Sequence, residues 1–129
     1  METTFISDLQ QIVGEQHTLV DKESLALYGY DSTPELESRP GAVLLPANAD
    51  EVARIMTCCH SAGISVSPRG SGTSLSGGSL SIDGGVVIQT SRMNRILEVD
   101  QENLTATVEP GVLTSTLHRA VESLGLFYP

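Results

Sequence analysis

The 129-residue chain has no tryptophan and few aromatic residues, three Tyr and two Phe. It is also poor in basic residues. Seven Lys and Arg stand against 16 Asp and Glu, which gives a net charge of −9 at pH 7. This surplus of negative charge disfavours binding to nucleic acid or to an anionic membrane surface. An anionic ligand would therefore have to be held by local groups, because the overall field of the protein repels it.

The chain has two cysteines, Cys58 and Cys59, and such neighbours cannot readily form a disulfide with each other. The N-terminus has neither the basic region nor the apolar stretch of a signal peptide. No apolar run is long enough to be a transmembrane segment. Together these features predict a protein of the reducing cytoplasm. The hydrophobic content of 40% is enough for the packed core of one domain.

The sequence predicts no metal site and no catalytic side chain. Cys58, Cys59 and His60 are contiguous, so on a helix they point in different directions, and no second cluster could complete a tetrahedral site. We expect Cys59 in the core and His60 on the surface. No Ser–His–Asp or Cys–His arrangement suggests nucleophilic catalysis.

The stretch from Pro68 to Gly78 contains four glycines, three serines and a threonine in eleven residues. Such a run cannot build a core. It can turn successive backbone N–H groups toward one anion, because glycine readily adopts a positive φ. We therefore interpret it as a loop that holds a pyrophosphate. The residues expected at this site are Pro68, Arg69, Gly70, Ser71, Gly72, Thr73, Ser74, Gly77 and Gly78.

The expected roles within this loop differ by residue type. Gly70 and Gly72 would supply positive φ angles and a close approach to the ligand. The residues Ser71, Thr73 and Ser74 would donate amides or hydroxyls to phosphate oxygens. Gly77 and Gly78 would let the backbone pass the ligand. Arg69 has two alternatives, an ion pair with phosphate or hydrogen bonds to carbonyls of the loop itself.

Two familiar nucleotide-binding motifs do not fit this loop. A P-loop needs Lys followed by Ser or Thr after its last glycine, but Ser79 follows Gly78. A Rossmann fingerprint needs a third glycine where Leu75 stands, and it opens a helix. Residues 79–85 are a poor helix, and a strand follows. The pattern is strand–loop–strand, so the amides must act without a helix terminus.

Patterns along the chain predict an α+β fold. Helices are expected over residues 5–13, from Asp21 through Tyr28, from an Asn48 cap to Gly63, and over 113–124; strands are expected over 42–45, 64–67, 85–90, 96–99 and 104–109. The strand–helix–strand over 42–67 makes a small parallel βαβ unit, with the glycine-rich loop at the carboxyl end of its second strand. The last two strands make an antiparallel hairpin, with Leu104, Ala106 and Val108 on a buried face.

Several of these segments together resemble the FAD-linked oxidases of the vanillyl-alcohol oxidase and PCMH type. The resemblance is strongest for the branch of the glycolate oxidase FAD subunit and D-lactate dehydrogenase. It rests on the loop, on Leu45-Pro46 before it, on Gly84 to Ile88 after it, on Val108 to Val112, and on Leu124 to Pro129. It runs from about Tyr28 to Pro129. The family's second flavin-contacting glycine pair, its substrate domain and its catalytic histidines would all lie beyond Pro129.

The resemblance implies that FAD is the cofactor and that the fold is part of a PCMH-type FAD-binding domain. A helical segment over residues 1–37 would precede that domain, which would occupy 38–129 and continue beyond it. The whole protein would oxidise a 2-hydroxy acid of the glycolate or D-lactate type by hydride transfer to flavin. This fragment would be inactive alone.

Two alternatives remain open at the level of the sequence. The chain could be a stand-alone nucleotide-binding or interaction module that dimerises through a sheet edge and its apolar C-terminus, where a downstream domain would otherwise pack. An enolpyruvyl-sugar reductase of the same superfamily fits less well, because its loop lacks the run from Pro68 to Thr73.

Overall fold

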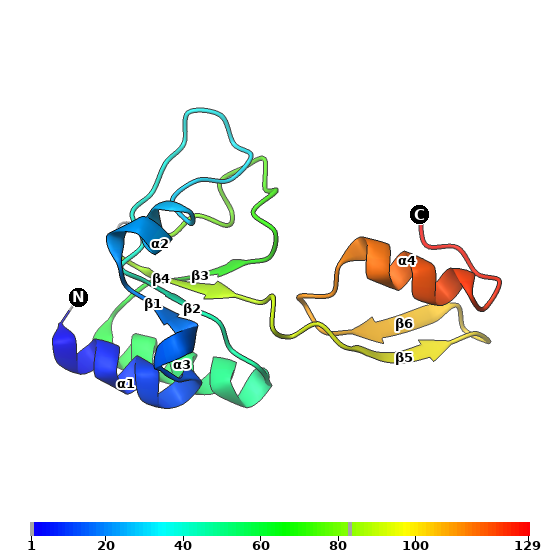
Figure 1. Ribbon diagram of the computed structural model, residues 1–129, viewed down its shortest axis with the longest axis horizontal. Coiled ribbons are helices and arrows are strands. Elements are labelled where there is room, and N and C mark those ends of the chain that lie inside the picture. The colour runs from blue at the N-terminus through cyan, green and yellow to red at the C-terminus, as the bar shows by residue number, and fades with distance from the viewer. Residues whose placement is uncertain (1, 83) are drawn as a thin grey trace. The chain divides into compact units, whose positions relative to one another are not determined.

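The computed structural model describes residues 2–82 and 84–129 (Figure 1). The chain forms two compact units, one that ends at Arg92 and one over Met93–Pro129. The first unit contains the glycine-rich loop. The division into segments 1–37 and 38–129 stays a prediction.

The first unit is built on a four-stranded sheet. Its strands are β1 (Thr18–Leu19), β2 (Ala42–Leu44), β3 (Val66–Arg69) and β4 (Val86–Gln89), in the order β1-β2-β4-β3. β4 is parallel to both of its neighbours, whereas β1 is antiparallel to β2. The predicted strand–helix–strand unit is present, with β4 between its two strands. The short edge strand β1 was not predicted, because two residues are too few to show a periodic pattern.

Helices α1 (Thr3–Val13) and α3 (Ala49–Ala62) pack against each other on one side of this sheet (Figure 1). Their apolar positions meet alternate residues of the strands, as the period of two in a strand requires. The buried residues of this core are Leu9, Val13, Ala42, Leu44, Ile55, Cys59, Val86 and Ile88. Val43 and Val87 are also fully buried, so the central strands are covered on both faces, as the wholly apolar sequence predicted.

The predicted placement of Cys59 in the core and of His60 on the surface is confirmed. Cys59 is fully buried, and burial raises the pKa of its thiol to about 11. His60 is exposed. Across the part of the chain that the structure describes, no three His, Cys, Asp or Glu side chains are placed to hold a metal ion. None of the described helices is both long and apolar enough to cross a membrane.

Helix α3 begins with the capping arrangement that the sequence predicted. The side chain of Asn48 accepts a hydrogen bond from the amide of Glu51 at 2.9 Å. The Glu51 carboxylate accepts a hydrogen bond from the amide of Ala47 at 2.8 Å. In a standard capping box the donor would be the amide of the N-cap residue, Asn48, one position later. The helix ends at Gly63. The shorter helix α2 (Lys22–Ala26) has the expected Asp21 cap but ends before Tyr28.

The second unit is an antiparallel hairpin followed by a helix. Strands β5 (Ile96–Asp100) and β6 (Thr105–Val108) pair as predicted, and α4 spans Thr114–Glu122. Two hydrogen bonds from Arg95 to Glu109 fix the base of the hairpin. The Arg95 guanidinium donates to the Glu109 carboxylate at 2.7 Å, and the Arg95 amide donates to the same carboxylate at 2.8 Å. These bonds from Arg95 hold the pKa of Glu109 below its usual range.

The expected burial of one face of β6 was wrong. All of Leu104 to Val108 is exposed, with Leu104 at 72%. Within this unit a two-stranded hairpin lacks further strands that could cover it. A cavity of about 470 Å³ separates it from α4 and Leu126–Tyr128. The alternation in the sequence was real, but α4 and Leu126–Tyr128 leave a cavity against this strand and do not cover it.

The cap of α3 leads to a stability prediction. Replacing Asn48 with Ala should lower the free energy of unfolding by about 1 kcal/mol, because the amide of Glu51 loses its acceptor. Urea denaturation followed by circular dichroism measures this. Arg54→Ala, an exposed change in the same helix, is the control and should shift stability by less than about 0.5 kcal/mol. Equal effects of the two variants would contradict the capping role.

Candidate functional site

The glycine-rich loop leaves β3 at Arg69 and returns to the sheet at β4, which lies beside β3. It therefore starts at the carboxyl end of a parallel strand, as predicted, where ligands usually bind in sheets of this kind. Figure 1 shows it rising beside the loop that follows α2. We refer to residues Tyr28–Ser38 of that neighbouring loop as the brace, because its contacts hold the glycine-rich loop in place.

Arg69 points inward and bonds to the brace. Its side chain is largely buried, and the residue is 8% exposed. Its Nη1 donates a hydrogen bond of 2.8 Å to the carbonyl oxygen of Tyr30. Its Cζ lies 5.4 Å from the centre of the Tyr28 ring, a cation–π distance. The sequence left open whether Arg69 pairs with phosphate or bonds to carbonyls of the protein. The structure contains a bond to a carbonyl, that of Tyr30 in the brace.

Gly72 lies directly over the Arg69 guanidinium. Its φ is +72°, which confirms the predicted positive angle. A Cβ at this position would come within 2.6 Å of the Arg69 Cζ, so any larger residue would displace the guanidinium. The same prediction for Gly70 was wrong. Gly70 has no positive φ, and a Cβ there would meet nothing within 4 Å. Gly70 lies in a bend directly after β3.

The second half of the loop is held by its own hydroxyls and by the brace. The Ser74 hydroxyl accepts hydrogen bonds from the amides of Ser76 at 3.3 Å and Gly78 at 3.1 Å. The amide of Gly77 donates to the Thr33 hydroxyl of the brace at 2.7 Å. A Cβ on Gly77 would lie 2.5 Å from Cδ2 of Leu36, so the brace packs closely here. These amides are used within the protein.

The first half of the loop presents unused donors. Within residues 2–82 and 84–129, no acceptor is found for the amides of the five residues from Gly70 to Ser74. The side chains of Ser71 and Thr73 are exposed. Residues 70–74 are exposed or half-buried, so these amides are open to solvent or to a ligand. A run of free amides on a loop that is held on both sides is therefore a suitable place for an anion.

Asp31 anchors the brace to the loop. Its carboxylate accepts from the Thr33 amide at 2.8 Å and from the Ser79 hydroxyl at 3.1 Å. Burial of the carboxyl raises the pKa of Asp31, but the bonds from Thr33 and the hydroxyls of Ser79 and Ser74 lower it by more. The net pKa lies below its ordinary value. No pattern in the sequence predicts this role, because Asp31 stands in a polar stretch that is typical of a solvated loop.

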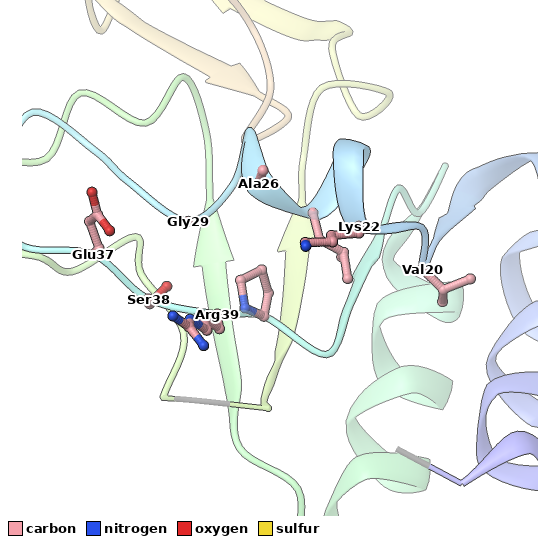
Figure 2. A pocket seen from close by; sticks show the side chains of 9 residues that line it. Val20, Lys22, Ala26, Gly29, Glu37, Ser38 and Arg39 are labelled. Atoms are coloured by element: carbon pink, nitrogen blue, oxygen red, sulfur yellow. The ribbon is translucent and has the colours of Figure 1, made fainter.

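A cavity of about 640 Å³ lies between α2 and the two ends of the brace (Figure 2). Figure 2 shows Val20, Lys22 and Ala26 lining it from α2 and the chain before it. Residues 37–40, at the end of the brace and directly after it, also line the cavity. None of its lining residues belongs to the stretch from Pro68 to Gly78. The glycine-rich loop remains the predicted phosphate site.

A family model described as an FAD binding domain matches residues 40–129. The chain belongs to the FAD-binding domain family. The match includes the whole glycine-rich loop, and the predicted cofactor, FAD, is confirmed at the level of the family.

The known relatives of this FAD-binding domain are longer proteins. This chain is 49% identical over 121 residues to the glycolate oxidase subunit GlcD of Bacillus subtilis, and the match covers 94% of this chain and 26% of that protein. It is 32% identical over 128 residues to D-2-hydroxyglutarate dehydrogenase of Stutzerimonas stutzeri, covering 99% and 28%. The chain thus spans about a quarter of the length of these relatives.

Solved structures confirm the fold of this FAD-binding domain. The structure of p-cresol methylhydroxylase with bound substrate superposes with a TM-score of 0.83 at 22% identity, covering 95% of this chain and 25% of that one. The predicted class, a partial PCMH-type domain with a parallel unit followed by an antiparallel hairpin, is confirmed.

The described residues fit the phosphate part of FAD. The free amides of residues 70–74 supply donors, and Gly70 leaves open space for an approaching oxygen. The nine predicted site residues remain predictions as ligand contacts. Among them, Nη1 of Arg69 and the amides of Gly77 and Gly78 donate to groups within the protein.

A matched pair of glycine variants tests this placement. Gly72→Ala should weaken ADP binding more than tenfold and destabilise the fold by about 1–2 kcal/mol, because a positive φ is strained and the Arg69 side chain is displaced. Gly70→Ala should leave thermal stability unchanged, since its Cβ meets nothing. Isothermal titration calorimetry and a melting curve measure both. ADP binding by Gly72→Ala that equals the parent's would show that the loop is not the site.

The shifted pKa of Asp31 predicts an acid-sensitive brace. A carboxyl whose pKa is lowered by folding stabilises the protein above its unfolded pKa, and this contribution is lost as the pH falls through the folded pKa, below about pH 4. A ¹³C NMR titration of the side-chain carboxyls should find Asp31 ionised to lower pH than a model aspartate. Asp31→Asn should lose this part of the acid dependence. An Asp31 that titrates at or above the ordinary value would contradict the bonding described here.

Proposed function

We propose that this chain holds the pyrophosphate of FAD on the amides of Gly70 to Ser74. The whole protein would be an oxidoreductase that acts on a 2-hydroxy acid. The observation that carries the binding proposal is the run of amides with no acceptor among the residues that the structure describes. This run lies on a loop that is held by bonds of Arg69 and Thr33. The names of the relatives support the substrate class, since glycolate, 2-hydroxyglutarate and lactate are all 2-hydroxy acids.

The division of labour follows from the chemistry. FAD, when bound, supplies the isoalloxazine ring that accepts a hydride. This chain supplies binding and orientation of the cofactor, and none of its described side chains is assigned to proton transfer. Neutral amide dipoles suit the task, because a net charge of −9 opposes the approach of a dinucleotide and only short-range donors offset that repulsion.

Oxidation of glycolate or D-lactate in particular, dimerisation, and a cytoplasmic location expected from the cysteine content remain predictions. The alternative of a stand-alone module has one supporting observation in the second unit. There, Phe127 is 72% exposed beside the cavity of about 470 Å³. Nucleotide titration separates the two functions.

Titrations of the 129-residue chain with FAD and with ADP test the proposal. If the loop alone provides the contacts, FAD and ADP should bind with affinities within about threefold of each other and without a shift of the flavin spectrum. Raising the salt from about 0.05 to about 0.5 M should not weaken binding, because screening reduces the overall repulsion and the amides carry no net charge.

The outcomes are distinct. A loss of affinity of tenfold or more with salt would point to a direct ion pair and contradict the amide site. Binding of neither nucleotide would contradict the proposal for this chain and favour the stand-alone interaction module. Much tighter binding of FAD than ADP, with a shifted spectrum, would add a flavin contact in the chain to the phosphate site.

A further inference from the structure

Three hydrogen bonds join the brace to the glycine-rich loop and to Ser79, the residue that follows it. The Thr33 hydroxyl accepts from the Gly77 amide at 2.7 Å and lies 3.4 Å from the carbonyl oxygen of Ser74, to which it donates. The Ser79 hydroxyl donates to Asp31 at 3.1 Å. More than forty residues separate the partners in each pair. The brace therefore adds long-range bonds to the local ones that the Ser74 hydroxyl accepts from Ser76 and Gly78.

The two brace residues are also fixed relative to each other. The Asp31 carboxylate accepts from the Thr33 amide two residues later, which is the bond of an Asx turn. This places the Thr33 hydroxyl between Ser74 and Gly77, where one oxygen serves as acceptor and donor. Ser79 is 7% exposed, so its bond to Asp31 is shielded from water. Asp31 and Thr33 thus act as one clamp, a name we use below for this pair.

The clamp separates the loop into two parts. Beyond Ser74, the amides of Ser76, Gly77 and Gly78 are all bonded to hydroxyls. Before it, the amides of residues 70–74 have no acceptor within residues 2–82 and 84–129. The bond from Thr33 to the Ser74 carbonyl lies at the boundary between the two parts. The position of the free amides is therefore set from one end by Arg69 and from the other by Thr33.

We propose that Thr33 and Asp31 are positioning residues for the pyrophosphate site, and that they keep the free amides of residues 70–74 ordered before a ligand arrives. The inference rests on the proposed function and extends it to residues outside the loop. A flexible glycine-rich loop would otherwise lose conformational entropy on binding, and that loss would reduce affinity. With the clamp in place, the loop loses this conformational entropy when the domain folds, before the ligand binds.

Removal of the Thr33 hydroxyl tests the clamp. Thr33→Val keeps the shape of the side chain but leaves the Gly77 amide without its acceptor. ADP binding should weaken about tenfold, which corresponds to about 1.4 kcal/mol. Thr33→Ser keeps the hydroxyl and should restore binding to within about twofold. Thr57→Val is the matched control, because the Thr57 hydroxyl bonds only to Ala53 of its own helix, and it should bind ADP like the parent.

Amide hydrogen exchange gives a second readout that a purely structural role elsewhere would not move. In ¹⁵N NMR spectra of the parent, the amides of Gly77 and Gly78 should exchange slowly. Thr33→Val should speed exchange at Gly77 while the amides of α3 keep their protection. If Thr33→Val fails to fold, Ser79→Ala carries the test. It removes the hydroxyl bond to Asp31 and should weaken ADP binding about threefold.

The outcomes separate the clamp from the site itself. A parent chain that binds ADP together with a folded Thr33→Val that binds it equally well would overturn the positioning role and leave the proposed function intact. Amide hydrogen exchange at Gly77 that is the same in Thr33→Val as in the parent would also overturn the positioning role and leave the proposed function intact. A parent chain that binds neither ADP nor FAD would overturn the proposed function, and the positioning role with it.

Discussion

Arg69 carries a positive charge into the interior at the point where β3 ends, and the brace has to supply groups that stabilise it. It does so with the carbonyl of Tyr30 and the ring of Tyr28. Gly72 can then pass over the guanidinium because it has no side chain. The loop thus folds over an arginine rather than over an apolar core. An isolated buried charge is costly unless it is bonded, so the brace and the loop depend on each other.

This dependence explains how a loop rich in glycine can present a fixed set of donors. Glycine makes the required turns accessible but gives no preference among them. Hydrogen bonds have to supply the order. Some are local, to the Ser74 hydroxyl, and others are made by one hydroxyl and one carboxylate in a segment more than forty residues away in the chain. Only Ser74 belongs both to the residues whose amides could bind a phosphate and to those whose bonds hold the loop.

The sequence predicted the elements whose causes are local. The apolar run at Ala42–Leu44, the Asn48 cap with Glu51, and the glycine-rich loop after β3 were all found where expected. It did not predict the brace, because a Thr hydroxyl that serves an amide 44 residues away leaves no periodic signal. Gly70 was misjudged for a related reason, since composition shows which residues allow a positive φ but not which of them use it. The pattern on β6 was read correctly as amphipathic, yet burial depends on what packs against the strand.

The order of the strands gives the glycine-rich loop a second constraint. β3 and β4 are parallel neighbours, so residues 70–85 also form the crossover connection between them. Parallel neighbours cannot be joined by a tight turn, and their connection needs a dozen or more residues. The length of the loop is therefore limited from below by the geometry of the sheet, whatever it binds. Substitutions in the loop act on ligand contacts, whereas deletions of more than a few residues would break the pairing of β3 with β4 first. Within this fold, the loop can change its chemistry far more easily than its length.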